Sequence, residues 1–483
     1  MNNDMKSNPS SQNDPLNYFR GFPPLAGVCS FYEAERVGYS VDEAVTYFKR
    51  FHWAMRRIWH ILISRIASER VYELKMGYSY HAHLLAEQIA DLRSRVGEMR
   101  EPPLGLDVCP DATLDVFFDE ILCASTTLET VTGLYAVALP TLCDDLRHHI
   151  QTTNPLVDAP SIRLLKHAAD DLHGIITWGR QTIEAVAASS PNESLTAITS
   201  DFASYLAAAG GIAGRTKRKG EISRRRSACS FSYDLVPKRD ERFSDPFNSA
   251  VNAEAMIHGD YPDRIKALML LYKRLREVDV PEMMASILMQ TPGKPWGYYR
   301  DMTRQLWDEA RHAIMGQVGF RQLGLDWSKI PIRHAWAYEL NTILTAQERH
   351  GVLYFIERGL MPKAGKQHEW EVAQRAENHL LATFQDFDWA DEVLHARIGR
   401  NWYVKEFATP AEAIDFGDKA WTSIFTKRQD YAANGLTAHR NWWPDFYRHA
   451  CDVLGLEFDP QIAAYEENDL ETRADLKKMA TSA

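Results

Sequence analysis

Asp308-Glu309-Ala310-Arg311-His312 and Asp391-Glu392-Val393-Leu394-His395 are two copies of one pattern, Asp-Glu-x-x-His. Both copies lie in sequence that favours helix. A Glu and a His three residues apart lie on one face of a helix. Two such helices that face each other bring together the carboxylates and imidazoles that hold a pair of iron or manganese ions. About one Glu-x-x-His is expected by chance in a chain of this size, so the second copy, with the same preceding Asp, is what indicates a site.

The sequence around the two copies has helical periodicity, and no sustained period-2 run indicates a sheet. We therefore expect an all-α fold. The second half of the chain has candidate helices at about 263–290, 297–320, 332–360, 367–376 and 378–404. Prolines and glycines at 292–295, 324–331 and 359–365 separate them. Residues 251–409 are thus predicted to form one antiparallel bundle, and 410–483 a helical extension that frays from Glu466.

Two Glu-x-x-His helices need two further carboxylates, one from each partner helix. For the first motif we choose Glu282, which precedes Glu309 by 27 residues with the turn at Pro292–Pro295 between them. An antiparallel pair would then place both carboxylates at similar height. Glu277, on an adjacent turn, is the alternative.

For the second motif we choose Glu357, 35 residues before Glu392, because the loop and short helix between them use up the extra length. Glu348 and Glu339 are competitors on the same predicted helix. The predicted metal ligands are Glu282, Glu309, His312, Glu357, Glu392 and His395.

These residue types suit two transition-metal ions. Carboxylates are hard oxygen donors that can bridge two cations, and imidazole binds Fe(II) well. Four glutamates balance the charge of two Fe(II) ions, so that no buried charge is left unpaired. Asp308 and Asp391 precede the ligand glutamates and can accept the free ring N–H of a ligand histidine, which fixes its tautomer.

This residue set resembles the ferritin-like di-iron carboxylate superfamily. Its members include ribonucleotide reductase small subunits, bacterial multicomponent monooxygenases, acyl-carrier-protein desaturases and bacterioferritins. The Asp-Glu-x-Arg-His form at 308–312 is similar to a pattern that many members carry. The stretches 356–360 and 395–402 resemble a bacterial ferritin-like family of mostly unassigned function. The resemblance covers residues 262–404, about a third of the chain.

The resemblance implies a non-haem di-iron oxidase or oxygenase that acts on a small organic molecule, with O2 as co-substrate. Glu309 and Glu392 would bridge two Fe ions, or a Mn/Fe pair, and would be the catalytic carboxylates. Glu282 with His312, and Glu357 with His395, would be terminal ligands. A ferredoxin-type partner or the substrate would supply electrons, and the superfamily's habit is a homodimer. Members that oxygenate aryl amines can carry a third His where this chain has Asp388, so that activity is not carried over.

The first half, residues 41–211, is expected to form a second, degenerate ferritin-like bundle, which gives two bundles in tandem. Its candidate helices lie at about 41–66, 68–97, 112–150 and 160–187. Asp170-x-x-His173 has Asp in place of Glu, and Ala90 stands three residues after Glu87, where a ligand His would be needed. We expect no metal there. Residues 1–40 are predicted to be a tail, and 212–250, with its arginines from Arg215 to Arg226, a solvated basic linker.

Composition limits the function classes. The net charge of −10 argues against general binding of nucleic acid or acidic membranes. No apolar run is long enough to span a bilayer. The polar N-terminus has no apolar signal core, and the six cysteines are scattered as in proteins with reduced thiols, so the chain is expected to be cytoplasmic.

Three other function classes stay open at this point. One is iron handling or stress protection without an organic substrate. Another is hydroxylation of tRNA, for which the basic segment 215–226 is the only support. The last is a scaffold that kept the fold without activity. The common nucleotide-binding, zinc-protease and serine-hydrolase motifs do not occur in the sequence.

Overall fold

The computed structural model describes residues 19–99, 105–220, 222–427 and 431–465. Within these ranges every regular element is helical and none is a strand, which confirms the all-α prediction. No described helix is long and apolar enough to cross a membrane. The chain divides into two compact units, a first unit of residues 1–58 with 87–231 and a second unit of 59–86 with 232–483. Residues 59–86, which we expected in the N-terminal bundle, therefore belong with the C-terminal unit.

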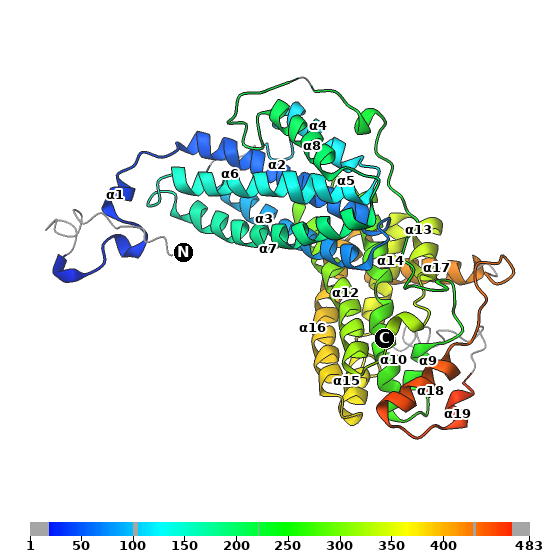
Figure 1. Cartoon of the computed structure of the whole chain (residues 1–483). Coiled ribbons are helices and arrows are strands. Elements are labelled where there is room, and N and C mark those ends of the chain that lie inside the picture. Colours follow the sequence, from blue (N-terminus) through cyan, green and yellow to red (C-terminus); the bar gives the residue numbers. More distant parts are fainter. Residues whose placement is uncertain (1–18, 100–104, 221, 428–430, 466–483) are drawn as a thin grey trace. The chain divides into compact units, whose positions relative to one another are not determined.

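The first unit is built from eight α-helices, two of which continue into the second unit (Figure 1). The two shared helices are α2 (Val41–Ile66) and α3 (Tyr72–Met99). The others are α1 (Phe31–Ala34), α4 (Ala112–Leu122), α5 (Thr127–Val131), α6 (Leu139–Thr152), α7 (Ala159–Ser189) and α8 (Leu195–Ala209), with a π-helical turn at Thr132–Ala138.

The expected single helix at 112–150 is interrupted because side chains begin new helices inside it. Asp111 caps the start of α4, and the Thr126 hydroxyl accepts a hydrogen bond from the Glu129 amide to start α5. Helix α8 was not expected, although its signals are in the sequence. Ser194 caps its start, and Gly210 ends it in the left-handed conformation with φ 80°.

The basic segment 215–226 is folded against the first unit. Its arginines pair with carboxylates of that unit, so that most of its positive charge is neutralised within the unit. Arg226 lies 2.7 Å from both Glu129 and Asp201. The other ion pairs are Arg215–Asp145, Arg218–Asp111, Arg224–Asp119 and Arg225–Asp201.

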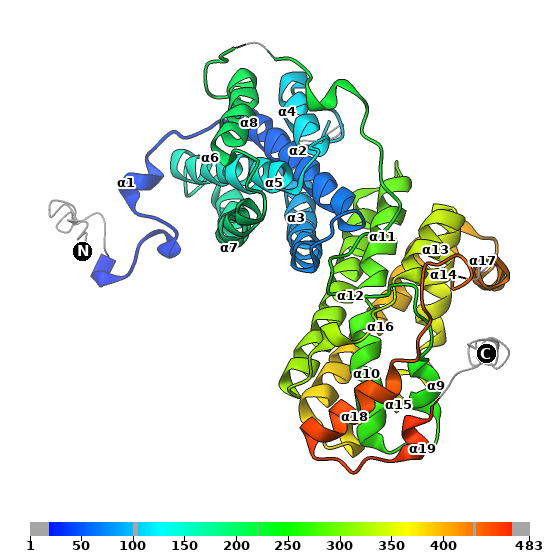
Figure 2. The ribbon, with the colours of Figure 1, turned by 45° about the vertical axis from the view of Figure 1, so that its right-hand side comes forward.

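The second unit holds the helices of the C-terminal half, several of which pack against one another. In Figure 1 and Figure 2, α10, α12 and α16 run side by side. Helix α14 packs on α16, and α15 packs on α10 and α16. The helices are α9 (Ala253–His258), α10 (Asp263–Arg276), α11 (Asp279–Gln290), α12 (Trp296–Gln322), α13 (Ala335–Ile343), α14 (Ala346–Gly359), α15 (Lys366–Arg375), α16 (His379–Trp402), α17 (Pro410–Lys427), α18 (Trp443–Leu454) and α19 (Pro460–Ala463).

Two expected helices of this half are each divided in two. The helix predicted at 263–290 breaks at Glu277 and Val278, between α10 and α11. Pro281 explains the break, because proline cannot donate to the carbonyl of Glu277, four residues earlier, and its ring clashes with that carbonyl. The helix predicted at 332–360 breaks where Thr345 and Glu348 form a capping box that starts α14.

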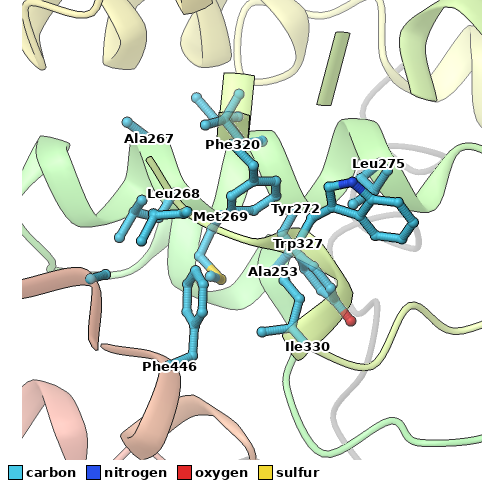
Figure 3. Packing of buried hydrophobic residues seen from close by; sticks show 14 of the residues in the cluster. Ala253, Ala267, Leu268, Met269, Tyr272, Leu275, Phe320, Trp327, Ile330 and Phe446 are labelled. Carbon is cyan, nitrogen blue, oxygen red and sulfur yellow. The ribbon is translucent and has the colours of Figure 1, made fainter. Parts of the chain in front are cut away.

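A large apolar core holds α10 and α12 in place. Figure 3 shows Met269 of α10 between Phe320 of α12 and Phe446 of α18, with Trp327 and Ile330 close by. All five side chains are buried. Each large apolar side chain that is fully buried contributes roughly 1.5–3 kcal/mol, so this cluster fixes the helices that carry the first motif.

A glycine one turn after each motif histidine allows a neighbouring helix to approach closely. A Cβ atom at Gly316 would lie 2.4 Å from the backbone nitrogen of Leu275 on α10, which no real structure permits. A Cβ atom at Gly399 would lie 2.3 Å from the ring of Tyr354 on α14. The repeated pattern is therefore longer than its first five letters, Asp-Glu-x-x-His-x-x-x-Gly in both copies.

Candidate metal centre

The two motifs face each other from α12 and α16. Glu309, His312, Glu392 and His395 are all at most 2% exposed. The Nδ1 atom of His395 lies 3.2 Å from Oε1 of Glu309 and 3.4 Å from Oε2 of Glu392. The Nδ1 atom of His312 lies 3.7 Å from Oε2 of Glu309. Glu309 thus presents one oxygen to each histidine.

Two further glutamates complete the cluster, one from each partner helix. Glu357, in the last turn of α14, has Oε1 3.9 Å from Nδ1 of His395. Glu277, at the C-terminal end of α10, has Oε2 3.5 Å from Nδ1 of His312. Three sets of donor atoms, each within 4.8 Å of one another, have a composition and spacing that could hold a metal ion. They are Glu309, Glu357, Glu392 and His395; Glu277, Glu309 and His312; and His312, Asp388 and Glu392.

Glu282, which we chose from the sequence, is not part of these sets. Its carboxylate lies 2.6 Å from Nζ of Lys75 and 2.9 Å from the guanidinium of Arg239, in a fully buried ion-pair network. The choice assumed one continuous helix. Five residues along a helix turn a side chain by about 140°, so Glu277 and Glu282 point to different faces, and the break at Glu277 directs that carboxylate to the cluster.

The two competitors of Glu357 are also away from the cluster. Glu348 is half-buried and accepts hydrogen bonds from the backbone N–H and the hydroxyl of Thr345. Glu339 is buried on α13, where Tyr431 donates a hydrogen bond to it at 2.7 Å. The structure therefore brings together Glu309, His312, Glu357, Glu392 and His395 of the six predicted ligands, with Glu277 in the place given to Glu282.

The outward ring nitrogens of the two histidines face the aspartates of the opposite motif. Nε2 of His312 lies 3.0 Å from Oδ2 of Asp391, and Nε2 of His395 lies 3.4 Å from Oδ2 of Asp308. Arg311 contacts both aspartates at 2.7 Å. Burial raises the pKa of Asp308, but His395 and neighbouring arginines outweigh it and hold that pKa well below its usual range. Both aspartates can therefore accept an N–H from the ring that faces them and leave Nδ1 directed into the cluster.

Several polar atoms inside the cluster have no hydrogen-bond partner among the described residues. Buried polar atoms without a partner are rare in proteins and often mark a ligand or ion. All of these lie on the inner side of the cluster and are donor atoms for a transition metal. They are Nδ1 of His312, Nδ1 of His395, Oε2 of Glu277, Oε2 of Glu357 and Oε2 of Glu392.

Because several carboxylates lie close together, their pKa values shift in opposite directions. Burial raises the pKa of Glu309, but the neighbouring imidazoles of His312 and His395 lower it to about 2. The pKa of Glu357 is instead raised well above its usual value, by burial and by the neighbouring Glu392 carboxylate. Burial lowers the pKa of each histidine, yet the surrounding carboxylates raise both well above the ordinary value. In the metal-free protein, protons thus take up part of the charge that cations would neutralise.

Three charged residues of the cluster were not found from the sequence. Lys366, at the start of α15, is 1% exposed, and its Nζ lies 2.8 Å from Oε1 of Glu392 and 2.8 Å from Oδ2 of Asp388. Arg274, fully buried on α10, pairs with Asp388 and lies 2.7 Å from Oε1 of Glu277. Asp388 was noted only as a departure from a family pattern. No periodicity reveals a buried lysine, because lysine in a loop or at a helix end is usually solvated.

A cavity of about 110 Å³ opens beside the cluster. One end is formed by Glu277, Glu309, Glu357 and Glu392, and the histidines do not line it. Apart from these glutamates, the lining is mixed, with apolar side chains and with charged side chains of α9, α10 and α11. The apolar lining residues are Val280, Trp336, Leu353, Ile356 and Leu360, and the charged ones are Glu254, Lys273, Arg276 and Asp279.

The candidate residues of the first half do not form a comparable set. Asp170 and His173 are both exposed on α7. Glu129 accepts hydrogen bonds from Ser125 and pairs with Arg226. Among the residues that the structure describes, all three potential metal-binding sets lie in the second unit.

Comparison of the chain with protein-family models, with curated proteins and with solved structures gives no match.

Proposed function

We propose that the second unit binds two metal ions, an Fe/Fe or Mn/Fe pair, and is a non-haem oxidase or oxygenase that uses O2 to oxidise a small organic molecule. The observation that carries the proposal is the cluster of four glutamates and two histidines, whose inner atoms lack hydrogen-bond partners. The proposal includes a ferritin-like origin of the bundle. The paired Asp-Glu-x-x-His helices, each with a partner glutamate, support this origin.

The donor set fits two divalent ions. Glu309, Glu357, Glu392 and His395 would hold one, and Glu277, His312 and the second oxygen of Glu309 would hold the other, with Glu392 also within reach of His312. Four glutamates match the charge of two divalent ions, and the chemistry that such a pair supplies when bound is the transfer of electrons to O2. We propose Glu309 and Glu392 as its catalytic carboxylates.

The protein's own residues would then orient the imidazoles and shape the reaction space. With metal bound, Asp391 and Asp308 would hold the rings of His312 and His395 in the tautomer that offers Nδ1 inward. The cavity beside the glutamates, with Trp336, Leu353 and Ile356 among its lining residues, would give a small organic substrate direct access to the cluster. Electrons would come from a ferredoxin-type protein or from the substrate.

A ferritin-like protein that only oxidises or stores iron is the second candidate, because the same donor set would serve it. The cavity lined by Trp336, Leu353 and Ile356 favours an organic substrate over it. For hydroxylation of tRNA, the arginines of 215–226 offer little free charge, since their partners are carboxylates of the first unit. We propose that the first unit is a metal-free bundle.

The test is to load the purified protein with Fe(II) without oxygen, admit O2 and follow the optical spectrum and the iron count. The proposal expects about two ions per chain and one rapid optical change per loading. Continued oxidation of many further ions per chain would support iron storage instead. Absence of bound iron would contradict both candidates.

A further inference from the structure

The two oxygens of Glu392 have different partners. Oε2 lies 3.4 Å from Nδ1 of His395 and has no hydrogen-bond donor, whereas Oε1 lies 2.8 Å from the ammonium group of Lys366. Glu309 lacks this asymmetry, because its two oxygens face the two histidines. A buried cation therefore holds the one oxygen of Glu392 that is not directed to His395.

The Lys366 ammonium also contacts Asp388, a further carboxylate near His312. Oδ1 of Asp388 lies 3.3 Å from Nδ1 of His312 and 2.9 Å from Nζ of Lys366. Arg274 adds a second cation, 2.7 Å from Oε1 of Glu277. The donors around His312 are thus engaged by protein cations at three carboxylates, those of Glu277, Asp388 and Glu392.

The donors around His395 contact fewer such cations, since only Glu392 touches one, through its Oε1. Glu357 accepts one hydrogen bond, from the neutral amide of Gln305 at 3.2 Å, and its other oxygen has no partner. Together with Glu309 and Glu392 it offers oxygen atoms that no lysine or arginine contacts at hydrogen-bond distance. The donors around His312 and those around His395 are thus similar in type, but more protein cations contact the donors around His312.

On the basis of the proposed metal site, we infer that Lys366 makes the two metal positions unequal. The position at His395 fills first and tightly. The position at His312 takes its ion only when the Lys366 ammonium releases Oε1 of Glu392, so that a one-metal form of the protein is populated between the two steps. Lys366 is a positioning residue in this account, since it acts through Glu392 and Asp388.

The size of the effect follows from charge repulsion. The Lys366 ammonium and a metal ion at the His312 position would lie a few ångströms apart in a partly buried site, where two cations repel each other by several times the thermal energy. We therefore expect the second ion to bind at least about tenfold more weakly than the first.

The experiment is an equilibrium titration of the full chain with Mn(II), with bound metal counted and followed by electron paramagnetic resonance. The wild type should bind in two steps, with the signal of an isolated ion after the first and of a coupled pair after the second. Lys366→Met should tighten the second step by about tenfold or more and remove most of the one-metal form. Lys329→Met is the control, because Lys329 is 75% exposed, pairs with Asp326 outside the donor sets, and should leave both steps unchanged.

A pair of further variants keeps the test valid if Lys366→Met does not fold. Glu277→Gln should abolish the weak step alone, and Glu357→Gln should weaken the tight step. Two equal steps in the wild type, or steps that Lys366→Met does not shift, would overturn the inference and leave the proposed function standing. A wild type that binds no Mn(II) and no Fe(II) would overturn both.

Discussion

His312 on α12 and Asp391 on α16 are joined across the two motif helices, with Nε2 of the ring 3.0 Å from Oδ2 of the carboxylate. The reciprocal pair, His395 with Asp308, lies at 3.4 Å. Each motif therefore supplies its inward donors for one half of the cluster and the orienting carboxylate for the other half. Because of this crossed arrangement, replacing the aspartate of one motif should change the orientation of the histidine ring in the other motif.

Asp391→Asn should weaken metal binding by about 10- to 100-fold, because the carboxylate that orients His312 is lost while the ligands stay. A metal titration monitors the change, and circular dichroism checks that the helices are retained. Asp386→Asn is the control, since Asp386 is exposed on the same helix. Equal affinity of both variants would show that the crossed pair does not orient the ring.

Glu277→Gln and Glu282→Gln should have opposite effects. Glu277 faces His312, so its loss should remove one metal ion per chain with a small effect on folding. Glu282 is completely buried between Lys75 and Arg239, so its loss leaves buried cations and should destabilise the fold by about 3–5 kcal/mol with the metal count unchanged. Urea unfolding and metal analysis of both proteins separate the two roles. Loss of metal in Glu282→Gln alone would restore our first choice of ligand.

Leu353→Trp should close the cavity beside the glutamates without removing metal, because Leu353 lines the cavity and is not in any donor set. Azide, a small anion that binds accessible metal ions, serves as the probe. We expect its binding to the iron-loaded protein to weaken by about tenfold. Val393→Trp is the control, because Val393 is 54% exposed. Equal azide binding in both variants would mean that small molecules reach the cluster by another route.

The pH should change folding stability and metal affinity in opposite directions. Burial lowers the pKa of His312 and His395, but the carboxylates around them raise both well above the ordinary 6.5. The charged rings therefore stabilise the metal-free protein fully below pH 6.5, and this contribution is lost as the pH rises through the higher folded-state values.

Metal ligation requires neutral imidazoles, so over the same window the affinity should rise with pH and protons should be released on binding. Unfolding of the metal-free protein and Mn(II) titrations, both between about pH 6 and about pH 9, test the two slopes. An affinity that does not depend on pH would contradict the ligation of these histidines through Nδ1.

The sequence predicted much of this arrangement because helical periodicity and motif repetition are local signals. The bounds of α2, α12 and α16 lie within two residues of those expected. The all-α class was confirmed. Helix α8 was not predicted, although Ser194 and Gly210 mark its ends.

The errors at the cluster have physical reasons. Glu282 was chosen by height along an unbroken helix, whereas Pro281 breaks that helix and leaves Glu277 at the cluster. The glycines after each motif, Gly316 and Gly399, were a further repeated signal of close helix packing that we did not use. Lys366 was not found, because its burial depends on tertiary contacts with Asp388 and Glu392 on the following helix, α16.

The most direct test of the account is the number of metal ions that the chain binds. The purified protein and the double variant Glu309→Ala/Glu392→Ala would be loaded with Fe(II) without oxygen and analysed by mass spectrometry, with Glu348→Ala as the control because Glu348 only caps α14. We predict about two ions per chain for the wild type and the control, and none for the double variant. A double variant that keeps its metal, or a wild type that binds none, would contradict the proposed metal centre.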